Sequence, residues 1–169
     1  GIDNTAAVYG GFIVFAKNLE GGENKIENIK IENPIEIVLI NSGKAALTKE
    51  VVGDVRKLYD ANPEKIKAFF EEYKKLVEEG KKALADYNIE KISELMEKNQ
   101  ELLRQITVSS DLLESIITLA KDSGAIAAKL TGTGRGGSVI ALTPGKELQE
   151  SVANKVKDAG YEVTLTTIG

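Results

Sequence analysis

The chain has 169 residues and a formal net charge of −4, with 42% hydrophobic and 28% charged residues. This allows one domain with a hydrophobic core and gives no overall basic field for nucleic acid or anionic lipid. Cysteine and histidine are both absent, which excludes disulfides, Cys/His zinc sites, thiol nucleophiles and histidine bases. Acid–base chemistry must therefore fall to Asp, Glu, Lys or Tyr. No apolar run is long enough to span a bilayer, and we expect a cytoplasmic protein without nucleic-acid or membrane partners.

The N-terminal part of the chain predicts β structure. Residues 8–17 and 25–33 are apolar enough for two strands, and the Gly-Gly pair between them indicates a hairpin. Residues 35–41 form a more strongly buried strand, and Pro34 marks a break before it. Because a lone hairpin is marginal in water, we expect residues 1–33 to pair with the sheet edge or with a segment outside this chain.

The middle of the chain predicts four amphipathic helices between residues 48 and 124, from apolar residues repeating at helical spacing. Thr48 is the predicted N-cap of the first helix. The fourth helix is predicted to begin at Ser110–Asp111, with Glu114 three residues after Asp111 in a capping box. Gly124 follows as the residue that ends this helix.

The C-terminal part returns to strands. Residues 125–131 and 138–143 read as two short strands around a glycine-rich loop, followed by a helix over 146–159 and a strand over 161–167. The order is therefore strand, helices, strand–loop–strand, helix and strand. It predicts an α+β two-layer sandwich with a four-stranded antiparallel sheet packed on helices, plus an N-terminal β-hairpin outside that sheet.

The loop between those strands, TGTGRGG, is the most informative segment for function. Glycine permits positive φ and close backbone approach, and successive exposed amides can form an anion-binding nest. Thr133 adds a hydroxyl, and Arg135 adds a forked cation suited to phosphate. A P-loop is excluded because no GK[ST] follows, and a Rossmann loop would lead into a helix; a flexible hairpin remains the alternative. The four glycines are Gly132, Gly134, Gly136 and Gly137.

Three further positions are candidates on weaker grounds. Taken alone, the run Asp3, Asn4 and Thr5 predicts a cap cluster for a short helix more readily than an active-site carboxylate. Thr48 is chiefly a predicted cap, although the loop after a buried strand is also a common place for a substrate contact. Asn99 falls on the apolar stripe of its helix, where an amide needs partners, and it is predicted to cap a neighbouring loop.

Together these segments resemble one family. GIDNTAAVYGG, residues 1–11, is similar to the SG-x-D…GG segment of mevalonate kinases. KLTGTGRGGSVIAL, residues 129–142, resembles the third conserved motif of the GHMP kinase superfamily, K-L-T-G-A-G-G-G-G-C. NSGKAALTKEVVGDVRKL and NQELLRQITVSSDLLESI resemble the mevalonate kinase segment after the central strand and a later helix pair. The likeness covers nearly the whole chain, in the right order.

The resemblance implies ATP-dependent phosphorylation of the 5-hydroxyl of mevalonate in isoprenoid biosynthesis. By this analogy Asp3 is the catalytic carboxylate, and Asn4 and Thr48 bind the substrate. The loop Gly132, Thr133, Gly134, Arg135, Gly136 and Gly137 lines the ATP-phosphate site. Residues 34–169 correspond to the ferredoxin-like C-terminal domain of a GHMP kinase, and residues 1–33 to a remnant of its N-terminal domain. The resemblance also carries the expectation of a homodimer.

The sequence departs from the family pattern in two ways. Thr133 and Arg135 replace small loop residues, so Arg135 either adds a phosphate contact or fills space meant for substrate. The G-x-G-S-S-A phosphate loop and the Mg²⁺ ligands of the N-terminal half do not occur here. We therefore expect the C-terminal half of a kinase, inactive alone, with the N-terminal half as partner. Alternatives are another GHMP kinase, of the phosphomevalonate, homoserine or galactose type, or a non-catalytic α+β binding or dimerisation module.

Overall fold

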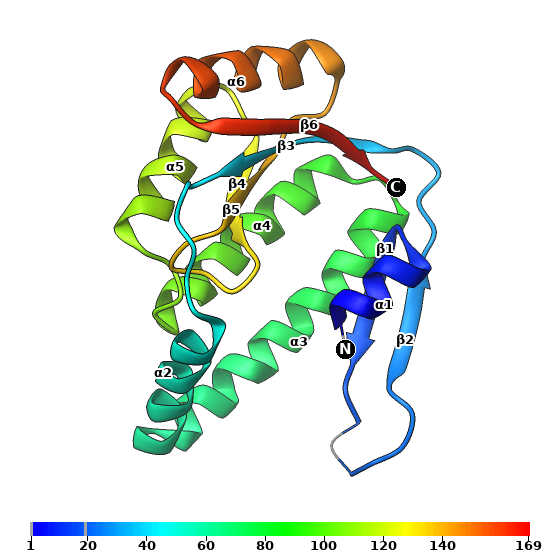
Figure 1. Ribbon diagram of the computed structural model, residues 1–169. Coiled ribbons are helices and arrows are strands. Elements are labelled where there is room, and N and C mark those ends of the chain that lie inside the picture. Colours follow the sequence, from blue (N-terminus) through cyan, green and yellow to red (C-terminus); the bar gives the residue numbers. More distant parts are fainter. Residues whose placement is uncertain (1, 19) are drawn as a thin grey trace.

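The computed structural model describes residues 2–18 and 20–169, with the backbone alone for residues 2 and 3. Figure 1 shows the arrangement of the helices and strands. The elements are α1 (Ile2–Tyr9), β1 (Phe12–Ala16), β2 (Lys25–Ile29), β3 (Ile35–Asn41), α2 (Thr48–Ala61), α3 (Pro63–Ala85), α4 (Ile89–Gln105), α5 (Asp111–Asp122), β4 (Ala127–Thr131), β5 (Ser138–Leu142), α6 (Lys146–Asp158) and β6 (Glu162–Ile168).

Four of the strands form one antiparallel sheet in the order β4-β5-β3-β6. Ile37 of the central strand β3 lies opposite Leu142 on β5 and opposite Thr166 on β6. This strand order, with α5 before β4 and α6 before β6, is that of a ferredoxin-like unit, into which α2, α3 and α4 are inserted after β3. The predicted α+β fold with a four-stranded antiparallel sheet on helices is therefore confirmed.

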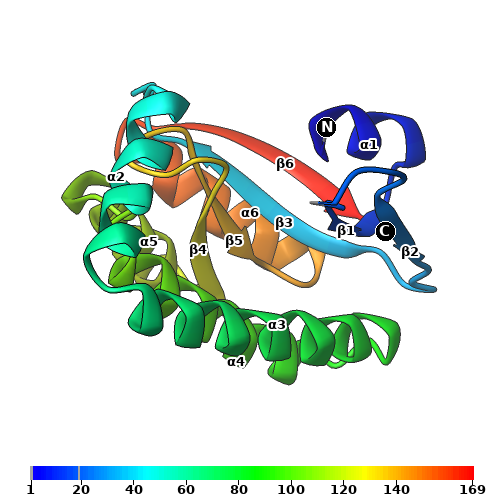
Figure 2. The same cartoon turned by 90° about the horizontal axis from the view of Figure 1, so that it is seen from below.

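The two faces of the sheet bury different helices, because successive strand residues point to opposite sides. Val38 and Ile40 belong to the cluster that packs on α5 and α6. Ile35 and Ile37 belong to a second cluster, which packs on α3 and α4. Figure 2 shows α3 and α4 running below the sheet, with α4 next to β4. The sheet is thus held from both sides, and its second face becomes one wall of a cavity.

The N-terminal segment forms a unit of its own. Residues 8 and 9 belong to α1 rather than to the predicted strand, which begins only at Phe12, after Gly10 and Gly11 at φ +63 and +58. β1 and β2 form the predicted hairpin. In the part of the chain that the structure describes, this hairpin is not hydrogen-bonded to the larger sheet, so the proposed pairing with the sheet edge is wrong. It lies beside α3 instead, where Lys81 Nζ contacts Glu27 Oε2 at 2.8 Å.

Two predicted helix starts need correction. The N-cap of α2 is Leu47, without a side-chain cap, and Thr48 is the first helical residue. Ser110 caps α5 as predicted, but Glu114 does not complete a capping box. Because Ser110 is the N-cap, the third helical residue is Leu113, and Glu114 lies one position too far along the helix. Its carboxylate instead accepts from Gln100 Nε2 at 2.8 Å and forms an ion pair with Arg104.

Candidate functional site

The glycine loop, residues 132–137, is held between two other loops. The Arg135 amide donates to the Val108 carbonyl at 2.8 Å, and the Gly137 amide donates to the Lys44 carbonyl at 2.7 Å. In return, the Ser42 amide donates to the Gly137 carbonyl at 2.8 Å. These bonds fix the loop in place, and they commit two of its amides to the protein's own backbone.

The glycines of this loop are required for different reasons. A Cβ on Gly134 would lie 2.2 Å from the Val108 carbonyl oxygen, and a Cβ on Gly136 would lie 2.8 Å from the Lys44 carbonyl oxygen. Gly132 has open space around it but a φ of +82. Two of the glycines therefore permit close approach of the protein's own backbone, and Gly132 permits a left-handed turn.

Thr48 and Thr133 meet at the mouth of the loop. Their Oγ1 atoms are 3.2 Å apart, although the residues are 85 positions apart in the chain. The Thr48 hydroxyl does not cap α2 and instead contacts the glycine loop. Thr48 is exposed and Thr133 is half-buried, so the pair presents two hydroxyls to solvent beside the N-terminus of α2.

Arg135 braces the loop. Its Nε donates to the Thr107 carbonyl at 2.9 Å, one terminal nitrogen donates to Thr107 Oγ1 at 3.1 Å, and the other donates to Asp54 Oδ2 at 2.5 Å. Hydrogen bonds from Arg135 and then from Lys57 hold the pKa of Asp54 below its ordinary value. The guanidinium thus ties the loop to α2 and to the α4–α5 connection, a role that the sequence did not indicate.

The predicted residues near the N-terminus lie elsewhere. The side chain of Asp3 lies outside the described residues. Asn4 is exposed within α1, and both views show α1 on the opposite side of the molecule from α2 (Figures 1 and 2). α1 begins at Ile2, so Asn4 and Thr5 lie inside this helix rather than at its cap. The structure therefore brings Thr48 to the glycine loop but does not bring Asn4 there.

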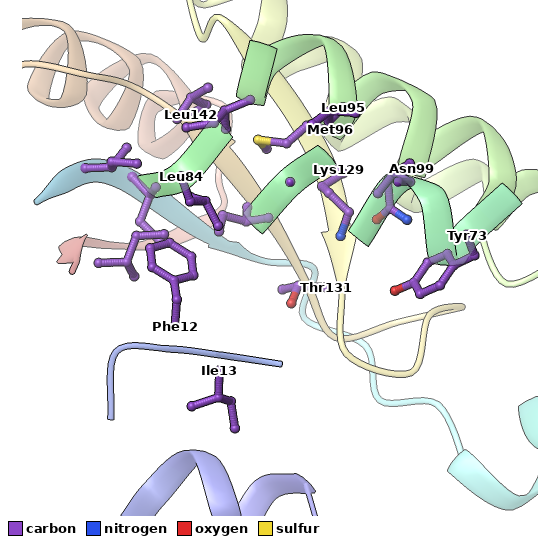
Figure 3. A pocket seen from close by; sticks show the side chains of 17 residues that line it. Phe12, Ile13, Tyr73, Leu84, Leu95, Met96, Asn99, Lys129, Thr131 and Leu142 are labelled. Carbon is purple, nitrogen blue, oxygen red and sulfur yellow. The ribbon is translucent and has the colours of Figure 1, made fainter. Parts of the chain in front are cut away.

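A cavity of about 530 Å³ lies between the sheet, α3, α4 and the hairpin. Lys129 and Thr131 of β4 line it together with Asn99 of α4 and Tyr73 of α3 (Figure 3). Burial lowers the pKa of Lys129 to about 8. The expectation that Asn99 caps a loop is wrong, because its Nδ2 has no hydrogen-bond partner among the described residues. The sequence feature that could have indicated this cavity is the lysine within the apolar run AIAAKLT, residues 125–131.

The described residues contain no group of three or more Asp or Glu side chains placed to hold a metal ion. They therefore do not fit a Mg²⁺ site by themselves. Over the same part of the chain, none of the helices combines the length and apolar character of a membrane span.

Comparison with known proteins shows what this chain is similar to. Residues 81–162 match the model for the GHMP kinases C terminal. The chain is 37% identical over 174 residues to a mevalonate kinase of Pyrococcus abyssi, an alignment that covers 99% of this chain and 49% of the relative.

Solved structures agree with this match. The crystal structure of L. major mevalonate kinase in complex with R-mevalonate superposes with a TM-score of 0.90 at 32% identity, over 98% of this chain and 51% of that one. A Streptococcus pneumoniae phosphomevalonate kinase has a TM-score of 0.73 at 23% identity, over 86% of this chain and 44% of that one, and so shares the fold alone. The chain spans about half the length of the curated relatives that it matches. Residues 81–162 therefore match the C-terminal region of GHMP kinases, and nearly the whole chain is similar to one half of mevalonate kinases.

Proposed function

We propose that this chain forms part of a kinase that transfers the γ-phosphoryl group of ATP to the 5-hydroxyl of mevalonate, in isoprenoid biosynthesis. The observation that carries the proposal is the likeness, over 98% of this chain, to a kinase whose crystal structure contains R-mevalonate. The fixed glycine loop and the two threonine hydroxyls at its mouth support it, because they offer a rigid polar surface for a small oxygen-rich substrate.

Asp3 is the proposed carboxylate beside the acceptor hydroxyl, acting as base or as orienting group. Phosphoryl transfer depends mainly on positioning and charge neutralisation, so a single carboxylate near the nucleophile suffices. Asn4 and Thr48 are the proposed substrate contacts. Figure 2 shows α1 on the other side of the molecule from α2, so the proposal requires the rest of the kinase to bring the segment that carries Asp3 and Asn4 toward Thr48.

Within the proposed site, the glycine loop would line the phosphate-binding region rather than wrap the phosphates. Two of its amides already donate to backbone carbonyls, and the guanidinium of Arg135 is bonded to Thr107 and Asp54. These bonds favour a supporting role, in which Arg135 keeps Thr133 against Thr48. ATP, when bound, supplies the phosphoryl group.

The remaining parts of the kinase are assigned to an N-terminal half that this proposal requires as partner. That half would supply the G-x-G-S-S-A phosphate loop and the Mg²⁺ ligands, and residues 1–33 would belong to its domain. A homodimer in the cytoplasm completes the proposal. By itself the 169-residue chain should show no kinase activity.

The test compares two proteins: the 169-residue chain alone, and the same chain joined to a GHMP N-terminal half that carries the phosphate loop. ATP consumption is measured with mevalonate, phosphomevalonate, homoserine and galactose as acceptors. We expect turnover only in the joined protein and only with mevalonate. Turnover by the chain alone, or preference for another acceptor, would contradict the assignment, and an inert joined protein would favour the non-catalytic module.

A further inference from the structure

The cavity behind the glycine loop is built mainly from apolar side chains. Phe12 points from the hairpin toward the helices, where Leu84 of α3 and Met96 of α4 line the opposite wall (Figure 3). The sheet contributes Ile140 and Leu142. Its volume of about 530 Å³ lies within the range of small-molecule sites, roughly 300–1,000 Å³. An apolar body of moderate size would therefore fit between the hairpin and the helices.

One end of this cavity is polar and cationic. Figure 3 shows Lys129, Thr131, Asn99 and the Tyr73 hydroxyl on one side of the view, with Phe12 and Leu84 on the other. The Lys129 ammonium donates to the Leu130 carbonyl at 2.6 Å. Among the residues that the structure describes, no carboxylate forms an ion pair with it and none that lines the cavity is acidic. A buried ammonium without a counter-ion is costly, and it attracts an anion.

Asn99 supplies a second donor. Its side chain is only 8% exposed, it lines the same cavity, and its Nδ2 has no partner in the part of the chain that the structure describes. Buried amides are nearly always hydrogen-bonded, so an unpaired one indicates a missing acceptor. Lys129 keeps its proton at neutral pH, because burial lowers its pKa only to about 8. Two donors thus face the cavity, and none of the described carboxylates lies among its lining residues.

We infer that this cavity binds a small apolar molecule that ends in a carboxylate or a phosphate. The anionic head accepts hydrogen bonds from Lys129 Nζ and Asn99 Nδ2, and the apolar body lies against Phe12, Leu84 and Met96. A nucleotide or a polyol is disfavoured, because most of the wall offers its hydroxyls and ring nitrogens no partners. The inference does not rest on the proposed kinase reaction, although Thr131 connects the polar end directly to the glycine loop.

The test is calorimetric titration of the 169-residue chain with n-octanoate, n-octyl phosphate, n-octanol and R-mevalonate, in the absence of ATP. Octanoate or octyl phosphate should bind saturably with one site per chain, and comparison of the two identifies the preferred head group. Octanol, which has the apolar body without the charge, should bind about tenfold more weakly or worse. R-mevalonate should also bind more weakly, because its hydroxyls would be desolvated at the apolar wall.

Two variants separate this site from non-specific binding. Lys129→Met keeps most of the length of the side chain and removes the charge, and it should weaken octanoate binding about tenfold or more while leaving octanol binding unchanged. Asn99→Leu removes the second donor and should weaken octanoate as well. Lys98→Met is the matched control, because Lys98 is an exposed lysine on the same helix as Asn99 and does not line the cavity. Circular dichroism checks that each variant is folded.

Three results would overturn the inference: no saturable binding of either anion, equal binding of octanol and octanoate, or unchanged octanoate affinity in both Lys129→Met and Asn99→Leu. Octanoate has no hydroxyl to phosphorylate, and the titration contains no ATP. Failure here therefore leaves the proposed kinase function standing, and failure of the kinase assay leaves this site standing.

Discussion

The contact between Gly134 and Val108 predicts a large and specific cost for one added methyl group. Gly134 has a φ of +87, and a Cβ there would lie 2.2 Å from the Val108 carbonyl oxygen. That oxygen already accepts the Arg135 amide at 2.8 Å, so it cannot move without breaking the bond that fixes the loop. Gly132 has a nearly identical φ of +82 but no atom within 4 Å of the added Cβ.

The two glycines therefore separate backbone strain from collision. In Gly132→Ala only the left-handed conformation is penalised, at about 1–2 kcal/mol. In Gly134→Ala the same penalty applies, and overpacking against fixed backbone adds roughly 1–3 kcal/mol. We expect losses of unfolding free energy of about 1–2 kcal/mol for Gly132→Ala and about 2–5 kcal/mol for Gly134→Ala.

Urea unfolding followed by circular dichroism measures both variants against the wild type. In thermal unfolding, each kcal/mol of lost unfolding free energy should lower the melting temperature by about 2–4 °C for a chain of this size. Losses that agree within about 0.5 kcal/mol would refute the reasoning, because they would show that the loop moves away from Val108 at no cost.

Three further predictions concern stability. Lys129→Met should raise the unfolding free energy at pH 7, because the wild type must bury a charged ammonium there, and this burial lowers the pKa of Lys129 from 10.5 to about 8. Between those two pH values the folded state has lost this proton and the unfolded state has not, so wild-type stability should rise by up to about 3 kcal/mol. Urea titrations at several pH values should find no such rise in the variant. Asp54→Asn should lower the urea midpoint at pH 7, and the difference should vanish in acid below the lowered pKa of Asp54. Gln100→Ala should cost about 2–5 kcal/mol in the same titration, since it removes the acceptor of the Leu130 amide, whereas the exposed Gln105→Ala should cost little.

The larger part of the fold follows from local sequence. Residues 35–41 and 161–167 carry the strand pattern clearly, and the structure has β3 and β6 there. Gly124, at φ +115, ends α5 as predicted. The short helix expected after the run Asp3, Asn4 and Thr5 is present, but it begins at Ile2 and extends to Tyr9. Val8 and Tyr9 are predicted as strand because both residue types favour strands, whereas the alanines before them favour a helix and the double glycine comes only after Tyr9.

The candidate site was less predictable, because its contacts join distant segments. The side chain of Arg135 alone predicts a phosphate ligand or a space-filling residue, but its partners Thr107 and Asp54 lie 28 and 81 residues away in the sequence. Local sequence predicts Thr48 as a helix cap, and it does not indicate the contact with Thr133, which lies 85 positions away in the chain. Asn99 faces a cavity whose other walls come from the hairpin and the sheet. No local pattern contains these pairings.

The most direct test of the central proposal is the turnover number of Asp3→Asn in the protein that joins this chain to a GHMP N-terminal half. If Asp3 is the carboxylate beside the acceptor hydroxyl, kcat for mevalonate should fall about a hundredfold to ten-thousandfold, with the fold intact by circular dichroism. Asp60→Asn, at an exposed acid of α2 that forms an ion pair with Arg56, is the control and should leave kcat unchanged. A wild-type kcat in Asp3→Asn would contradict the account.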